Sequence, residues 1–373
     1  MKKINLVVFP YRDAYFYNDY GPAVRDLQFI YELARSTHVA SITMVNRPVS
    51  IHERLLGRKK NYIDLPLNKV RTINSFSWDL IGPIKGRSWS AKAYNKVAEK
   101  TLREYHDNDC INVILDFLPI GKIRVESEGW YYWYDIVDNF TKHNRFTDSQ
   151  KKLVLEKYNY VLSNYDYLTG VSIEAILQIA NNDGFKKNNI KVVSNKVFKP
   201  SPIEVRTECS KRNKYDFGFI GFVTDKFDVE IVKKLSKTHT VAIYGKILDG
   251  EISKILDNLN NVTVFGAFNY KDIPNILDTF SVGLLPYLKS KSHDGSPLKL
   301  YEYIKKNLPC ITSIDYEVVH DEYIFNYNRK VLDENEIIRL LNCSGDERIS
   351  DMINDEWLLS KCIDDILIEI IAL

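Results

Sequence analysis

The residues best suited to chemistry lie in one stretch, 281–313, which reads SVGLLPYLKSKSHDGSPLKLYEYIKKNLPCITS. A short apolar strand is followed by a loop rich in Lys, Ser and His. A helix is predicted to begin near Pro297, because proline is well tolerated in the first helical turn. A Gly–Ser step before a helix presents backbone N–H groups and the positive end of the helix dipole. The pattern therefore indicates a phosphate-binding site.

Charged residues accompany this loop. Glu302 lies one turn into the predicted helix, where a carboxylate suits the paired hydroxyls of a ribose, and Lys299 adds positive charge. A capped helix explains the same pattern without a ligand. In that interpretation Asp or Ser before Pro297 is the N-cap and Glu302 is an ordinary surface residue. Spacing alone leaves both interpretations open.

The rest of the chain predicts the framework that positions these residues. Short strands rich in β-branched residues alternate with helical patterns, which favours parallel sheets with crossover helices. A polar, proline-containing stretch at 199–214 predicts a linker. We expect two doubly wound α/β domains, 1–198 and 215–354, and a last helical segment at 355–373. The expected strands are 4–9, 39–45, 111–117, 131–137, 165–171, 190–194, 215–220, 240–244, 262–265, 281–285 and 309–313, with helices between them.

Composition limits the function classes. The 373 residues are enough for two domains, and a net charge of +2 is too small for a dedicated nucleic-acid binder. The five cysteines are scattered, which predicts reduced thiols and no metal site. No G-x-G-x-x-G follows the first strand, which argues against a dinucleotide-dependent oxidoreductase. The apolar run 4–9 is too short for a signal peptide, so a cytoplasmic protein is expected.

One region is strongly basic. Residues 47–104 hold thirteen Lys and Arg against five Asp and Glu. Part of this charge falls at helical spacing, interleaved with aromatic residues; the residues concerned are Lys92, Lys96, Lys100, Arg103, Trp78, Trp89 and Tyr94. Tryptophan combined with basic residues predicts a peripheral contact with a membrane surface. The alternative is a solvated helix face with its tryptophans in the core.

The stretch 281–313 resembles the donor-binding segment of GT-B glycosyltransferases, particularly glycosyltransferase family 4 and the related bacterial transferases of O-antigen and capsule synthesis. The shared pattern is [DE]-G-x-P-x-K-x-x-E, whose two acids are Asp294 and Glu302 here. The resemblance implies a GT-B fold of two Rossmann-like domains facing a cleft, with the C-terminal helix at 355–373 packing back on the N-terminal domain. It also implies that Asp294 contacts the donor sugar and that Glu302 holds the nucleotide ribose. Backbone amides of the segment Gly295, Ser296, Pro297 and Leu298 would bind the pyrophosphate.

Three more segments match this family in order. YDFGFIG at 215–221 resembles the first strand of its C-terminal domain, IYGK at 243–246 the next strand end, and VTVFGAFNY at 262–270 the strand that leads to the base pocket. The resemblance adds basic and base-proximal residues to the donor site, namely Lys226, Gly245, Lys246, Phe268 and Lys299. The family usually has Glu where Asp294 stands, which leaves the identity of the donor sugar open.

The N-terminal half matches the family less closely. Gly21, followed by Pro22, stands where the family has paired glycines that close over the donor, although a simple turn before a helix is an equal interpretation. YDIVDNF at 134–140 resembles the family's strand end beside the cleft. Asp138 is therefore expected to orient the acceptor hydroxyl, and His143 to contact donor or acceptor, unless His143 is merely a surface residue.

These features together predict a hexosyltransferase. The donor would be a nucleotide-diphosphate sugar, with UDP-hexose favoured, and the acceptor a lipid-linked or growing surface polysaccharide. The resemblance implies retention of anomeric configuration, and no metal or other cofactor is expected. Two alternatives remain: a nucleotide-sugar epimerase or hydrolase of the same architecture, and a non-catalytic GT-B scaffold subunit of a polysaccharide assembly complex.

Overall fold

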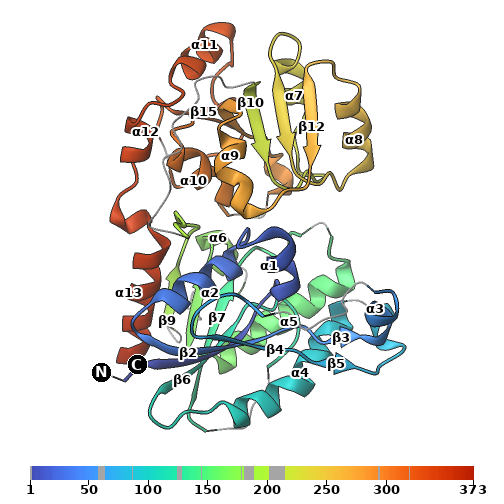
Figure 1. Cartoon of the computed structure of the whole chain (residues 1–373), viewed down its shortest axis with the longest axis vertical. Coiled ribbons are helices and arrows are strands. Elements are labelled where there is room, and N and C mark those ends of the chain that lie inside the picture. Colours follow the sequence, from blue (N-terminus) through green and yellow to red (C-terminus); the bar gives the residue numbers. More distant parts are fainter. Residues whose placement is uncertain are drawn as a thin grey trace. The chain divides into compact units, whose positions relative to one another are not determined.

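The structure is a computed structural model, and it describes residues 2–57, 64–85, 87–123, 128–143, 145–177, 179, 189–200, 215–292, 295–318 and 320–373. The chain forms two compact units (Figure 1). Unit 1 comprises Met1–Ser194, His293–Gly295 and Leu359–Leu373, and unit 2 comprises Asn195–Ser292 and Ser296–Leu358. Most of the expected linker, from residue 201 to residue 214, lies outside the described residues.

Unit 1 is built on a parallel sheet with the strand order β4-β2-β1-β6-β7-β8-β9. This order is the doubly wound arrangement 3-2-1-4-5-6 with one further strand. The central strand β1 (Ile4–Phe9) is buried along its whole length, as its unbroken apolar sequence predicts. The other strands are β2 (Val39–Val45), β4 (Val70–Ile73), β6 (Ile111–Asp116), β7 (Trp130–Ile136), β8 (Tyr167–Gly170) and β9 (Asn189–Val192).

The helices of unit 1 come from both ends of the chain. They include α2 (Arg25–Arg35), α4 (Arg87–Glu104), α5 (Asp148–Asn164), α6 (Ile173–Leu177) and α13 (Leu359–Ala372). The last of these, α13, packs against α2. Ser36 Oγ donates to Asp364 Oδ1 at 2.6 Å, and Lys191 Nζ lies 2.6 Å from Glu369 Oε1. The C-terminal helix therefore completes unit 1.

Several short elements of unit 1 are not predicted by the sequence patterns. They are α1 (Ala14–Tyr20), β3 (Val49–Ser50), α3 (Ile51–Leu55), β4 (Val70–Ile73), β5 (Phe76–Ser77) and the 3-10 helix η1 (Gly82–Lys85). Helix α1 is rich in aromatic residues, which are weak helix formers. Its N-cap holds it, because the Asp13 side chain accepts the Phe16 amide at 3.2 Å.

Unit 2 repeats the doubly wound arrangement. Its parallel sheet has the order β12-β11-β10-β13-β14-β15, which is again 3-2-1-4-5-6. The strands are β10 (Tyr215–Ile220), β11 (Val241–Tyr244), β12 (Val262–Gly266), β13 (Phe280–Leu285), β14 (Cys310–Thr312) and β15 (Ile324–Asn326). The helices include α7 (Val229–Leu235), α8 (Gly250–Asp257), α9 (Ile273–Leu277), α10 (Leu298–Lys305), α11 (Glu334–Asn342) and α12 (Arg348–Asp351).

Helix α10 is anchored beneath the centre of this sheet by Tyr303. The fully buried Tyr303 hydroxyl accepts the Ile220 amide at 3.2 Å and donates to the Leu284 carbonyl at 3.3 Å. The ring needs a residue without a side chain above it, because a Cβ added to Gly283 would lie 2.3 Å from Tyr303 Cδ2. One side chain thus joins α10 to both β10 and β13.

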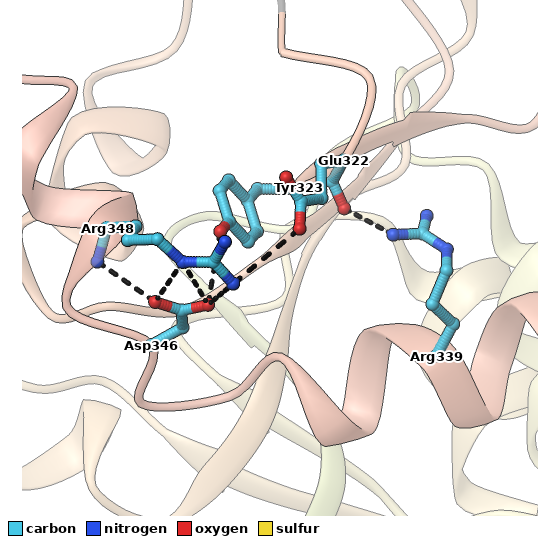
Figure 2. Close-up of polar contacts among 5 residues, drawn as sticks. All are labelled: Glu322, Tyr323, Arg339, Asp346 and Arg348. Atoms are coloured by element: carbon cyan, nitrogen blue, oxygen red, sulfur yellow. Dashed lines mark hydrogen bonds and ion pairs between the residues drawn. The ribbon is translucent and has the colours of Figure 1, made fainter.

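The C-terminal part of unit 2 is joined by a polar network on the protein surface (Figure 2). Arg348 Nη2 lies 2.6 Å from Asp346 Oδ2 and 3.7 Å from Glu322 Oε1. Tyr323 donates to Asp346 Oδ2 at 3.1 Å, and Arg339 donates to the Glu322 carbonyl at 2.5 Å. These contacts connect α11 and α12 to the segment before β15, a region for which the sequence patterns predict no element.

Candidate functional site

The candidate site lies where the strand order of unit 2 reverses, at the carboxyl ends of β10 and β13. Ligands of doubly wound sheets bind at this position. The loops that leave the two strands are hydrogen-bonded to each other, because the Asp228 amide donates to the Pro286 carbonyl and the Leu288 amide donates to the Lys226 carbonyl, both at 2.8 Å. As a result Lys226 Nζ lies 5.4 Å from the centroid of the Tyr287 ring.

A second lysine lies beside the same tyrosine. Lys299 Nζ lies 4.0 Å from the centroid of the Phe219 ring and donates to the Tyr287 hydroxyl. Burial, and to a smaller extent the charge of Lys226, holds the pKa of the Lys299 ammonium well below its ordinary value. Across the described ranges, no carboxylate lies within ion-pair distance of Lys226 or Lys299. Among the described residues, two lysine side chains therefore lie together here without a carboxylate partner.

The N-terminus of α10 adds backbone donors. The N-cap is Pro297, with φ −75° and ψ 135° and no side-chain hydrogen bond to the helix. The first-turn amides of Leu298 and Lys299 have no acceptor within the helix, as at every helix start. Ser296 is held just before them, because its carbonyl accepts Asn195 Nδ2 at 2.6 Å. The expectation of an amide donor at Pro297 is wrong, since proline has no N–H.

Glu302 is buried and engaged. It is 6% exposed, its Oε1 accepts the Tyr270 hydroxyl at 2.7 Å, and its Oε2 lies 2.7 Å from Lys305 Nζ. The interpretation of Glu302 as an ordinary surface residue is therefore wrong. Each carboxylate oxygen carries two lone pairs, so both can accept a further hydrogen bond from a ligand hydroxyl.

The other residues expected on the donor side do not all lie together in unit 2. Asp294 lies outside the described residues, and Gly295 belongs to unit 1. Gly245, with φ +142°, permits a close approach of two loops, because a Cβ there would lie 1.9 Å from the Gly221 carbonyl oxygen. The Lys246 side chain is exposed while its carbonyl accepts the Val223 amide at 3.1 Å, and Phe268 is half-buried.

The three residues expected in the N-terminal half lie in unit 1. Gly21, with φ 69°, ends α1, and its amide donates to the Tyr17 carbonyl at 2.6 Å. Asp138 and His143 both lie in the loop that follows β7. The His143 ring stacks on Phe140 at 6.1 Å, and its Nδ1 accepts the Arg145 amide at 3.2 Å, which requires the proton of the neutral ring on Nε2.

Sequence reasoning missed the tyrosines that organise this region. Tyr287 orients both lysines, Tyr270 binds Glu302, and Tyr303 fixes α10. A signal was present for Tyr287, which follows directly on the predicted strand end at Leu285 and Pro286, and for Tyr270, which ends the matched segment VTVFGAFNY at 262–270. Tyrosine is too frequent in this chain, with 24 residues, to single out Tyr303.

Comparisons with known proteins support the architecture. No protein-family model and no curated protein sequence matches the chain. It is similar in structure to AviGT4, a glycosyltransferase involved in avilamycin A biosynthesis, with 13% identity over 99% of this chain and 96% of that chain and a TM-score of 0.56. The chain is also similar in structure to Arabidopsis thaliana UGT89C1, solved in complex with UDP-L-rhamnose, with 12% identity over 99% of each chain and a TM-score of 0.53.

A third solved structure widens the range of activities with this architecture. The UDP-GlcNAc 2-epimerase of Methanocaldococcus jannaschii is 10% identical over 100% of both chains, with a TM-score of 0.51. At such identities the similarity shows the fold alone. The chain has the GT-B fold with two Rossmann-like domains, so this prediction is confirmed. The narrower assignment to glycosyltransferase family 4 stays a prediction.

Proposed function

We propose that the chain is a glycosyltransferase that uses a nucleotide-diphosphate sugar as donor, with a UDP-hexose favoured. The observation that carries this proposal is the pair Lys226 and Lys299, which lies without a described carboxylate partner at the strand-order reversal of unit 2. Lys299 lies in the first turn of α10, and the free backbone N–H groups of this turn add hydrogen-bond donors to the two lysines. A diphosphate is the ligand that satisfies this chemistry, because its oxygens accept from both amides and ammonium groups.

The same groups account for the chemical step. In that step the acceptor oxygen bonds to the anomeric carbon on the face from which the diphosphate leaves, the bond from that carbon to the diphosphate breaks, and the proton of the acceptor hydroxyl passes to the departing diphosphate oxygen. The negative charge that develops on the leaving diphosphate is stabilised by the α10 dipole and the two lysines, which are already in place. In this proposal Glu302 accepts from the ribose hydroxyls and Asp294 contacts the sugar, and the reaction requires no divalent metal.

We assign the acceptor to unit 1, where Asp138 orients its hydroxyl, and His143 contacts the donor or the acceptor. The acceptor class, a lipid-linked or growing surface polysaccharide, and retention of configuration both rest on the sequence resemblance. We assign to Gly21 the role of letting the donor come close to the backbone, because glycine has no side chain. These finer assignments depend on the donor site and are tested after it.

The first experiment measures thermal stabilisation of the full chain by a panel of UDP, GDP, CDP and their hexose conjugates. A ligand at 100 times its dissociation constant adds about 2.7 kcal/mol to the free energy of unfolding. We expect one nucleotide to stabilise selectively, the response to be lost in Glu302→Ala, and the response to survive in Glu251→Ala, an exposed control on α8. Glu302→Gln keeps the side-chain shape if the alanine variant misfolds. A protein that responds to no nucleotide contradicts the proposal.

A second experiment separates the transferase from the alternatives. The chain is incubated with the selected UDP-sugar without an acceptor, and the sugar and nucleotide products are followed by chromatography. An epimerase changes the sugar on the intact donor, and a hydrolase releases it quickly. A transferase leaves most of the donor intact until a glycan acceptor is added. Nucleotide binding without turnover under any condition favours the scaffold subunit.

A further inference from the structure

A small surface of unit 1 is formed by two chain segments that pair with each other. We name it the β3–β5 surface, and it consists of residues 49–57 and 76–85. Strand β3 pairs with β5 in parallel, with Val49 opposite Phe76. His52 Nε2 on α3 lies 2.6 Å from the Leu80 carbonyl oxygen, which joins α3 to the segment after β5. The two segments therefore form one local structure.

Large apolar side chains of this surface are exposed to solvent. The exposed fractions are 77% for Leu55, 66% for Leu56, 76% for Trp78, 59% for Leu80, 69% for Ile81 and 81% for Ile84. Isolated exposed apolar residues are ordinary on proteins, but a group of six on two adjoining segments marks an interaction surface. The Trp78 ring packs edge-on against the Phe76 ring, with the two ring centroids 4.9 Å apart.

Positive charge borders these side chains. The Arg54 guanidinium lies 5.3 Å from the Phe76 ring centroid, within the surface itself. Helix α4 begins next to η1, and its Lys92, Lys96 and Lys100 side chains are exposed along one face. Figure 1 shows α3, β3 and β5 in the same part of unit 1 as α4. The expected surface role of Trp89 and Tyr94 is wrong, because they are 6% and 4% exposed and lie in the core.

The two carboxylates within the β3–β5 surface, Glu53 and Asp79, are occupied by local contacts. Glu53 forms an ion pair with Arg47 and caps α3. Asp79 Oδ1 accepts the amides of Ile81 and Gly82 at 3.1 Å and 2.7 Å. The surface thus combines exposed tryptophan and aliphatic side chains with a surplus of cations, a combination that fits the interface of an anionic bilayer.

We propose that the β3–β5 surface binds an anionic lipid membrane. Trp78 and the exposed leucines and isoleucines enter the headgroup region, where tryptophan is favoured, and Arg54 and the α4 lysines contact lipid phosphates. A bilayer is favoured over a protein partner by this charge, since Arg54 lies within the surface and Lys92, Lys96 and Lys100 are exposed on the adjoining helix α4. The inference does not depend on the proposed transferase activity.

The test is flotation of the full chain with vesicles of phosphatidylcholine alone and of phosphatidylcholine with phosphatidylglycerol at about 3:1. We expect the chain to float with the anionic vesicles only, and less as salt is raised. The variant Trp78→Ser/Leu80→Ser/Ile81→Ser is expected to bind at least about tenfold more weakly. The matched control Val331→Ser/Ile338→Ser/Ile368→Ser removes apolar side chains that are 81%, 48% and 50% exposed elsewhere, and it is expected to float like the unchanged protein.

Two further measurements keep the outcome decisive. Lys92→Glu/Lys96→Glu is expected to weaken anionic binding several-fold without lowering the midpoint of thermal unfolding. Size-exclusion chromatography of the triple serine variant is expected to match that of the unchanged chain. A dimer that the variant converts to a monomer would identify the surface as an interface between copies and overturn the proposal. Flotation of the variant equal to that of the unchanged chain, or no flotation at all, overturns it as well.

Discussion

The two sheets have the same strand order but differ in what balances charge where that order reverses. In unit 2, Lys226 and Lys299 lie beside β10 and β13 without a described carboxylate partner. In unit 1 the corresponding strand β6 ends at Asp116, which is fully buried and forms an ion pair with the equally buried Lys157. Asp116 also accepts the Tyr165 hydroxyl at 2.6 Å and the Leu118 amide at 2.8 Å.

The next strand of unit 1 repeats this internal pairing. Arg25 donates to both oxygens of Asp135 at 2.9 Å, and Thr169 donates to Asp135 Oδ1 at 2.6 Å. Both members of the Arg25–Asp135 pair are at most 5% exposed. One topology therefore serves two purposes. Unit 1 uses buried charge to hold its own elements together, whereas in unit 2 Lys226 and Lys299 lie without a described carboxylate partner.

Breaking the Asp116–Lys157 pair is expected to have the largest effect. Asp116→Ala leaves the Lys157 ammonium buried without its partner, which costs about 3–5 kcal/mol in the free energy of unfolding. Urea denaturation followed by tryptophan fluorescence measures this loss. The double variant Asp116→Leu/Lys157→Met removes both charges and should recover most of it. A single variant as stable as the unchanged protein would show that unit 1 does not depend on this pair.

Replacing Lys299 tests the proposed nucleotide site at the carboxyl ends of β10 and β13. Lys299→Met is expected to weaken nucleotide binding by roughly 1.5–3 kcal/mol, the contribution of a hydrogen bond to a charged group. The ligand-free variant should be more stable, because the lowered pKa of Lys299 means that the unfolded chain binds this proton more tightly. Calorimetry and thermal unfolding measure the two effects. Weaker binding together with lower stability would instead indicate general damage to the fold.

A pH series tests how a buried carboxyl group, Glu32, affects the stability of unit 1. Burial raises the pKa of Glu32 to about 7 from 4.5, with the Asp364 charge adding to the shift and Arg35 opposing it. The folded state therefore binds more protons than the unfolded state between these values, and stability falls as pH rises through this window. Glu32→Gln should be more stable than the unchanged protein at pH 8 by roughly 3 kcal/mol and equal to it near pH 4. The exposed Glu99→Gln is the control.

The surface network of Figure 2 should contribute least. Hydrogen bonds from Arg348 lower the pKa of Asp346 to about 2, so its contribution is present above the ordinary carboxyl pKa and is lost as pH falls toward 2. Because both side chains are solvated, Arg348→Ala is expected to leave the urea midpoint at pH 7 within experimental error. A clear shift would show that buried charge is not the only kind that stabilises this chain.

Much of the fold follows from sequence patterns because buried parallel strands are short, apolar and β-branched. The strand expected at 4–9 is β1, and that expected at 215–220 is β10. Elements held mainly by individual polar contacts were not predicted. Helix α1 depends on Asp13, and β15 lies beside a network of charged residues that resembles a solvated loop in sequence.

The candidate site was partly predictable for a similar reason. A helix start after Gly, Ser and Pro is visible in sequence, and so is the spacing of Glu302. The pairing of Lys157 with Asp116 is not, because the two residues are 41 positions apart and lysine in a helix usually indicates a solvated face. The effect of Tyr287 on Lys299 likewise depends on loops that meet only after folding.

The membership of α13 in unit 1 has a consequence for synthesis of the protein. Helix α13 covers α2, yet the whole of unit 2 is translated between the sheet of unit 1 and this helix. Translation at about 5–20 residues per second separates the synthesis of α2 from that of α13 by roughly 16–65 seconds. The apolar face of α2 therefore stays uncovered on the ribosome until α13 has been made, after the whole of unit 2.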